Sequence, residues 1–138
     1  MKQLAGLCLC AVMTVFSCKK SNITPPDLTG TWNWNSTYSD SALGPTNPQT
    51  PANSGITKSL SFKNGDWSFT QNGVTVLEGG YSTSVLNSTY GKPANRIQYV
   101  RKNQTDSVTY YSISGDSLIF SYDLSGTVGS GVTFYIRQ

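Results

Sequence analysis

Few residues in this chain could carry out acid–base or nucleophilic chemistry. The sequence has 138 residues and no histidine, which removes Ser-His-Asp and Cys-His arrangements, His-ligated zinc and the usual proton shuttle at neutral pH. Glu78 is the only glutamate. Asp66, Asp106 and Asp116 each stand where a turn leads into an expected strand, a position that aspartate favours anyway, and no two carboxylates can be placed together as a glycosidase pair. The sequence therefore predicts a protein that is not an enzyme.

The cysteines and the modest net charge exclude further classes of function. Cys8, Cys10 and Cys18 all lie in the first 18 residues, so the rest of the chain has no disulfide and no thiolate metal site. We expect neither a metal nor another cofactor. The formal net charge is only +3 and no basic run exceeds two residues, which argues against binding to nucleic acid.

The first residues have the pattern of an export signal. Lys2 supplies a basic start and Leu4–Phe16 an apolar stretch, which is shorter than the about 20 apolar residues that a membrane-spanning helix needs. At its end, Val15-Phe16-Ser17-Cys18 resembles the lipobox of bacterial lipoproteins, although phenylalanine stands where a small residue is commoner. The resemblance implies that residues 1–17 are a signal peptide and that Cys18 is lipidated and becomes the mature N-terminus.

A polar tether separates this signal from the folded part. Residues 18–27 comprise the lipidated Cys18 and a short spacer that Pro25-Pro26 makes semi-rigid. Two or more acyl chains anchor a protein stably to a membrane, whereas one acyl chain binds reversibly. A lipoprotein with lysine directly after the cysteine, here Lys19, is expected in the outer membrane, facing the periplasm or the cell surface.

From Leu28 onward, apolar and polar residues alternate between turn signals, as in short β-strands. Asn64-Gly65 and Asn72-Gly73 predict two-residue hairpin turns, and Gly79-Gly80 predicts a bulge or a sharp bend within a strand. No helix is expected after the signal. The pattern predicts eight strands, at Thr31–Tyr38, Ile56–Lys63, Asp66–Gln71, Val74–Val85, Arg96–Lys102, Asp106–Ile113, Asp116–Asp123 and Val132–Arg137.

Hairpin turns at this spacing predict an antiparallel up-and-down meander over residues 28–138. Charged residues make up only 12% of the chain, and eight tyrosines and three tryptophans supply much of its apolar material, a composition that suits strands and turns better than helices. Eight strands close readily into a small barrel without exposed edges. The expected fold is therefore an all-β, eight-stranded barrel in one domain, with a β-sandwich as the alternative.

One pair of residues connects this expected barrel to a known family. Gly30-x-Trp32 begins the first expected strand, and Arg137 lies at the end of the last. The arrangement resembles the lipocalins and their relatives, the calycins, and in particular the small lipocalin-like lipoproteins of Bacteroidota-type bacteria. Other lipocalin motifs, such as Thr-Asp-Tyr before the seventh strand, are absent. The resemblance implies that Trp32 and Arg137 form a structural pair across the closed end, a cation–π contact worth about 0.5–2 kcal/mol.

The opposite end of the barrel is expected to be its mouth. Successive loops of a meander alternate between the two ends, so Ser39–Gly55 and Leu124–Ser130, the least regular connections, are expected side by side there. A lid over the mouth and a disordered insertion at a tolerant site are equally compatible with these sequences. Alternation places thirteen residues in the barrel interior: Trp34, Leu60, Phe62, Trp67, Phe69, Val74, Val76, Tyr99, Leu118, Phe120, Tyr122, Phe134 and Ile136.

Five residues are predicted to line a shallow cup beneath the mouth. Arg101 shares the parity of Tyr99, so it either faces inward to an anionic or polar ligand head or lies in solvent at a strand end. The rest of the predicted cup is aromatic. Its members are Trp34, Tyr38, Tyr99, Arg101 and Tyr122.

Two functions stay open from the sequence. The first is an outer-membrane lipoprotein that binds a small hydrophobic or amphipathic molecule at the loop-covered mouth, which requires an aromatic-lined cavity of at least about 300 Å³. The second is an interaction protein with a filled barrel, whose loops or exposed aromatic residues contact an envelope protein or a glycan. In both cases the lipid anchor is the contact with the membrane.

Overall fold

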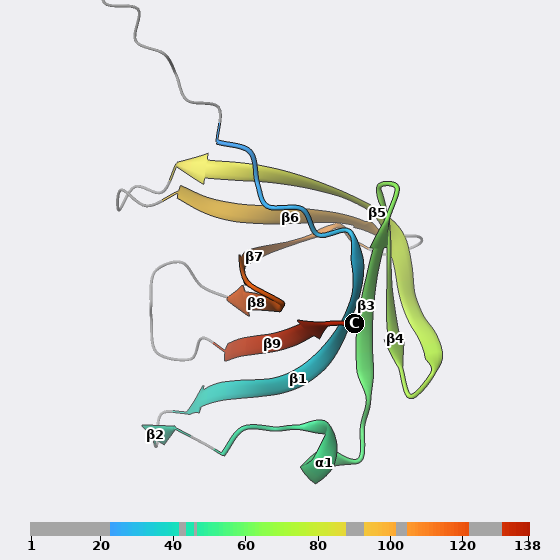
Figure 1. The fold of residues 1–138 in the computed structure, drawn as a ribbon, viewed down its shortest axis with the longest axis vertical. Helices are drawn as coiled ribbons and strands as arrows, with labels where there is room; N and C mark the ends of the chain where they lie inside the picture. Colours follow the sequence, from blue (N-terminus) through green and yellow to red (C-terminus); the bar gives the residue numbers. More distant parts are fainter. Residues whose placement is uncertain (1–22, 42–43, 46, 88–92, 102–104, 122–130) are drawn as a thin grey trace, which may run out of the picture.

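The fold is all-β and is built from short antiparallel strands (Figure 1). The computed structural model describes residues 23–41, 44–45, 47–87, 93–101, 105–121 and 131–138. Within them, eight strands form a closed up-and-down barrel. In chain order the elements are β1 (Gly30–Ser41), β2 (Gly44–Pro45), α1 (Pro51–Ser54), β3 (Lys58–Lys63), β4 (Asp66–Gln71), β5 (Val74–Asn87), β6 (Pro93–Arg101), β7 (Ser107–Ser114), β8 (Ser117–Ser121) and β9 (Gly131–Arg137).

Each barrel strand pairs with the next one in the chain, and the first strand closes the ring with the last. The order is β1-β3-β4-β5-β6-β7-β8-β9, and β9 returns to β1 along a ladder from Trp32↔Arg137 to Ser39↔Gly131. β2 has only two residues and pairs with β1 alone, so it is a short extension outside the ring. The predicted eight-stranded barrel is confirmed, and the β-sandwich alternative is wrong.

The two predicted Asn-Gly hairpin turns are present. Asn64 and Asn72 have positive φ values of 54° and 50°, which asparagine tolerates better than most residues. The ladders close at Lys63↔Asp66 and Gln71↔Val74, so each turn has two residues. These turns fix the register of β3, β4 and β5 through local chemistry.

The helix α1 lies in the connection after β1 and was not expected from the sequence. It is a single turn that a capping box holds: Thr50 N donates to Asn53 Oδ1 (2.8 Å), and Asn53 N donates to Thr50 Oγ1 (3.3 Å). Because capping rather than apolar periodicity stabilises it, hydrophobic patterning does not reveal it. In the part of the chain that the structure describes, no helix has the length and apolar character needed to cross a membrane.

Inward-facing side chains form one continuous core. Phe69, predicted in the interior, is partly buried and packs against this core. Most of the other predicted interior residues are buried members of it, while Tyr122 lies outside the described residues. The buried apolar residues are Leu28, Trp32, Trp34, Leu60, Phe62, Trp67, Ile97, Tyr99, Tyr111, Leu118, Phe120 and Tyr135.

The predicted parity of the last strand is wrong. Phe134 and Ile136 were expected inside, but Ile136 is exposed and the buried residues of β9 are Thr133 and Tyr135. The cause is the ladder with β1, which sets Tyr135 opposite the buried Trp34. Residues opposite each other in a ladder point to the same face of the sheet, so Phe134 and Ile136 face outward.

Val74 and Val76 were also expected inside and are in fact 66% and 55% exposed. The ladder between β4 and β5 is irregular here, because Phe69 pairs with Leu77 while Thr70 pairs with Thr75. The extra residue, Val76, breaks the alternation of β5, as β-bulges do. Val74 lies next to the β4–β5 turn, opposite Gln71. Leu77 packs against the core in place of the two valines.

A second register shift, between Trp34 and Ser36, reverses the parity of β1. Tyr38 was expected to share the face of Trp34, but it is 44% exposed. Its ring packs edge-on against Phe134, with ring centroids 5.7 Å apart. Tyr38 therefore belongs to the outer wall, and its predicted place in the cup is wrong.

The closed end is built on Trp32 and Arg137. Trp32 is completely buried, and the guanidinium carbon of Arg137 lies 4.2 Å from the centroid of its ring. Arg137 Nη1 donates to Thr29 O (3.1 Å), and Trp32 Nε1 donates to Leu28 O (2.8 Å). The pair expected from the sequence is therefore present, and its contacts are structural.

The chain ahead of β1 crosses this closed end (Figure 1). Leu28 is buried in the core, and Tyr111 Oη on β7 donates to Pro26 O (2.9 Å). The Asp27 carboxylate accepts from Thr29 N (2.9 Å) and Thr29 Oγ1 (2.7 Å), and these bonds lower the pKa of Asp27. Residues 26–29 thus form part of the barrel floor.

The environment of Tyr111 in the floor predicts that the free energy of unfolding falls at high pH. Burial, with the negative charges of Tyr81 and Asp27, raises the pKa of Tyr111 from 10.0 to about 12. The unfolded chain then loses this proton first, so the folded state binds more protons between these pH values and stability falls as pH rises through them. We expect Tyr111→Phe to cost about 1 kcal/mol at pH 7, from the lost hydrogen bond to Pro26, and to make the decline above pH 10 shallower. Urea unfolding of both proteins from pH 7 to 12 measures this difference. If the free energies of unfolding of the two proteins fall in parallel with pH, the prediction is wrong.

Candidate functional site

A cavity of about 340 Å³ lies inside the barrel, at the end away from Trp32 and Arg137. All eight strands of the ring contribute to its wall, and Gln49 contributes from the connection after β1. Its size exceeds the value that the ligand-binding hypothesis requires. The described residues that line it are Thr37, Gln49, Lys58, Leu60, Trp67, Phe69, Leu77, Tyr99, Arg101, Thr109, Phe120, Thr133 and Tyr135.

The connection after β1 folds back onto the mouth of this cavity. Thr37 N donates to Gln49 O (2.8 Å), and Gln49 N donates to Thr37 O (2.9 Å). Farther along, Thr57 N donates to Asn72 Oδ1 (2.9 Å) at the β4–β5 turn. The described part of this connection is therefore tied to the barrel at both ends, as expected for a lid rather than for a free insertion.

The charged groups on the cavity wall are all positive. Lys58 and Arg101 line it, and none of its described lining residues is a carboxylate. Lys58 Nζ lies 4.1 Å from the centroid of the Trp34 ring, and Arg101 Nη2 donates to Ser107 Oγ (2.9 Å). Apart from the amide of Gln49, the rest of the described wall is aromatic, aliphatic or hydroxyl-bearing. Such a surface favours an apolar body with an anionic or hydrogen-bond-accepting group.

The structure brings together some of the predicted site residues and not others. Tyr99 and Arg101 line the cavity. Trp34 is buried beneath Lys58 and donates from Nε1 to Thr37 Oγ1 (2.9 Å), so it supports the wall without lining it. Tyr38 is on the outside. Tyr122 and the predicted lipidation site, Cys18, lie outside the described residues.

Sequence reasoning missed five polar residues of the site, which are Lys58, Gln49 and the threonines Thr37, Thr109 and Thr133. Lys58 shares the parity of Leu60 and Phe62 on β3, so the alternation that found these two could have found it. Gln49 gave no such signal, because it lies in an irregular connection and reaches the cavity through its pairing with Thr37. Trp67, Phe69 and Phe120 were predicted as core, since parity does not say how far along the barrel each one lies. Tyr135, which also lines the cavity, was missed because the parity of β9 was wrong.

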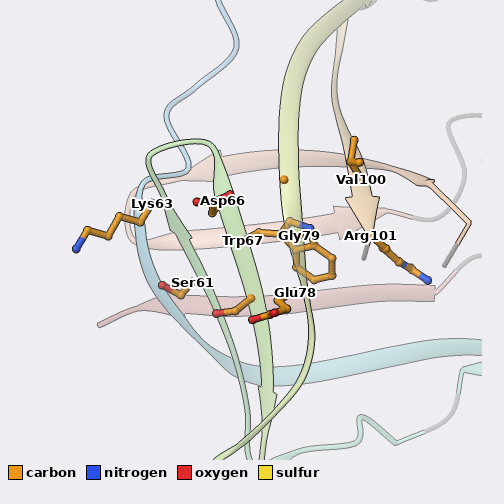
Figure 2. A pocket seen from close by; sticks show the side chains of 10 residues that line it. Ser61, Lys63, Asp66, Trp67, Glu78, Gly79, Val100 and Arg101 are labelled. Carbon is orange, nitrogen blue, oxygen red and sulfur yellow. The ribbon is translucent and has the colours of Figure 1, made fainter. Parts of the chain in front are cut away.

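A second hollow, of about 430 Å³, lies on the outer side of the wall at β3–β6 (Figure 2). Unlike the cavity, its described lining carries charges of both signs and includes Lys63, Asp66 and Glu78. Trp67 and Arg101 line both the hollow and the cavity. The two spaces therefore approach each other at these two side chains.

Trp67 lies beside Gly79, which has no side chain. Trp67 on β4 is paired with Gly79 on β5, yet its ring lies 4.5 Å, centroid to centroid, from the ring of Tyr99 on β6. Figure 2 shows the indole beside Gly79. The Trp67 ring therefore reaches across β5 at a position without a side chain.

Gly79 also lies very close to the backbone of β6. A Cβ atom placed there would overlap the carbonyl oxygen of Val100. β5 changes partner here, from β4 to β6, and Figure 1 shows it bending sharply. The sharp bend expected at Gly79-Gly80 is therefore present, while the bulge lies earlier, at Val76.

The fold and the cavity define the class of this protein as a closed, eight-stranded up-and-down barrel with an interior pocket. Comparison with known proteins adds no family: no protein-family model matches the chain, and neither does any curated protein or solved structure. The argument for function therefore rests on the geometry.

Gly79 and Gly80 offer a matched test of the wall. Gly79→Ala forces backbone atoms apart, so we expect it to cost more than about 2 kcal/mol of unfolding free energy. Gly80→Ala meets only Gly65 O at 3.7 Å, which is ordinary contact, so we expect its effect to stay within about 1 kcal/mol. Urea unfolding measures both. Equal costs for the two variants would show that the close approach at Gly79 does not constrain the barrel.

Proposed function

We propose that this protein is a membrane-anchored, lipocalin-like lipoprotein that binds a small hydrophobic or amphipathic molecule inside its barrel, without covalent chemistry. The observation that carries the proposal is the cavity of about 340 Å³ with aromatic walls. Eight-stranded barrels are at the size where side chains either fill the interior or leave space for one small ligand, and here space is left.

The binding energy would come from burial of apolar ligand surface. Transfer of such surface from water is worth about 25 cal/mol per Å² before the costs of association and ordering are subtracted. The walls offered by Leu60, Phe69 and Phe120 suit this transfer. The cavity is near the lower end of the roughly 300–1,000 Å³ range of ligand pockets, which favours a ligand of modest size.

The proposed orientation follows from the position of the tether. The lipid would be attached at Cys18, and the chain joins the barrel at Leu28 in the closed end. The cavity lies at the other end, so its mouth would face away from the outer membrane. Such a protein could collect a ligand from the surrounding aqueous space.

A second function, as an interaction protein, is favoured by one feature of the outer wall. Tyr38, Phe134 and Ile136 face outward on the paired strands β1 and β9, where Tyr38 is 44% and Ile136 39% exposed. Apolar side chains that gather on a solvent-exposed surface are common sites of contact with other molecules. An envelope protein or a glycan would be the partner.

Native mass spectrometry with a pair of variants distinguishes these functions. We expect protein purified gently from its original host to carry a reproducible adduct of metabolite or lipid mass that denaturation removes. Thr109→Trp would place an indole in the cavity and abolish the adduct. Val108→Trp, one residue along on the outward face of β7, would retain it. A bare protein mass, or an adduct that survives in Thr109→Trp and is lost in Val108→Trp, would contradict ligand binding in the barrel.

A further inference from the structure

The inner cavity and the outer hollow approach each other in the wall formed by β4, β5 and β6, where Trp67 and Arg101 line both spaces. β6 is described as far as Arg101, which pairs with Gly79, and among the described residues Val74–Glu78 of β5 pair only with β4. We call the place where these two side chains face both spaces, beside Gly79, the gap. It is a second place, apart from the mouth, where a ligand group can meet polar side chains.

A buried hydrogen-bond donor lies at this gap. Trp67 is 5% exposed, and its Nε1 has no hydrogen-bond partner among the described residues. The indoles of Trp32 and Trp34 behave differently, since they donate to Leu28 O (2.8 Å) and to Thr37 Oγ1 (2.9 Å). Buried N–H groups in folded proteins are nearly always paired. The exception at Trp67, in a residue that lines the cavity, indicates a ligand with a hydrogen-bond acceptor.

The distribution of charge indicates which kind of acceptor. On the inner side, the described lining residues carry only the positive charges of Lys58 and Arg101. The carboxylates of Asp66 and Glu78 line the outer hollow and not the cavity. Ser107 Oγ accepts a hydrogen bond from Arg101 Nη2 (2.9 Å) and so helps to orient the guanidinium, which suits planar carboxylates. An anion is therefore favoured on the inner side of the gap.

We propose that the ligand is an amphipathic monoanion whose carboxylate lies on the inner side of this gap, beside Gly79, and accepts hydrogen bonds from Trp67 Nε1 and from Arg101. Its apolar chain lies in the cavity against Leu60 and Phe120. The inference rests on the proposed function, because it names the ligand class and the head-group position for the same cavity. It places the head in the wall of the barrel rather than under the lid.

Calorimetric titration with octanoate and 1-octanol, which share an eight-carbon chain, tests this proposal. At pH 8, where octanoate is ionised, we expect the purified protein to bind octanoate at least about tenfold more tightly than 1-octanol, as a charge-assisted hydrogen bond provides. Arg101→Met should remove this preference, and Arg101→Lys should keep part of it. Trp67→Phe, which keeps a ring and removes the donor, should weaken octanoate binding about threefold to tenfold.

Two further variants locate the head group. Lys58→Met changes the other cation of the cavity, at the mouth, and should weaken the preference for octanoate less than Arg101→Met does. Arg96→Gln lies on β6 outside the cavity lining and is the matched control for loss of an arginine.

If Lys58→Met removes the preference and Arg101→Met does not, the proposed position of the head group is wrong. If octanoate and 1-octanol bind with equal affinity, the proposed preference for a monoanion is wrong, while the binding of a ligand in the barrel is supported. If neither ligand binds, both this inference and the binding of such amphiphiles in the barrel fail.

Discussion

The contact between Arg137 and Trp32 sets the arrangement of the whole barrel. It lies at one end of the ladder that joins the last strand to the first, and this ladder turns the meander into a closed ring. The same register determines which residues of β9 face inward, because Arg137, Tyr135 and Thr133 alternate on one side. A cation–π contact of this kind contributes about 0.5–2 kcal/mol, but its geometric effect extends along both strands. With residues 26–29 across the floor, it closes this end of the barrel.

The cavity exists because the regular alternation of side chains is interrupted in β1 and at Gly79. The register shift in β1 turns Tyr38 outward and brings Thr37 to the cavity wall, where it faces Thr133, with 3.2 Å between the hydroxyl oxygens. At Gly79, which has no side chain, the Trp67 ring reaches Tyr99 across β5. Large side chains fill the floor, whereas small hydroxyl-bearing side chains and the ends of long cations surround the upper part. A barrel of this size can therefore hold one small molecule.

The sequence was sufficient for the strands, the Asn-Gly turns, the closed ring and the Trp32–Arg137 contact, since each depends on local chemistry or on strand count. It was insufficient for Val76 on β5 and for Tyr38 on β1, because one extra residue in a ladder reverses the side chains beyond it. It was also insufficient for β9, because both faces of this strand carry apolar side chains and only the pairing of Tyr135 with Trp34 decides between them. One conflict was visible beforehand: Arg137 and Phe134 cannot share a face in a regular strand. The position of the Trp67 donor depends on how three strands bend together at Gly79, which no local pattern encodes.

The central claim is that an amphipathic ligand enters the barrel and meets the Trp67 indole. The most direct measurement is the ¹H–¹⁵N spectrum of the three tryptophan indoles during a titration with octanoate. Since Trp32 and Trp34 already donate to protein oxygens, the account predicts a saturable downfield shift of one indole proton, assigned to Trp67 by its loss in Trp67→Phe. Saturable binding that leaves the Trp67 resonance in place, or no binding at all, would contradict it.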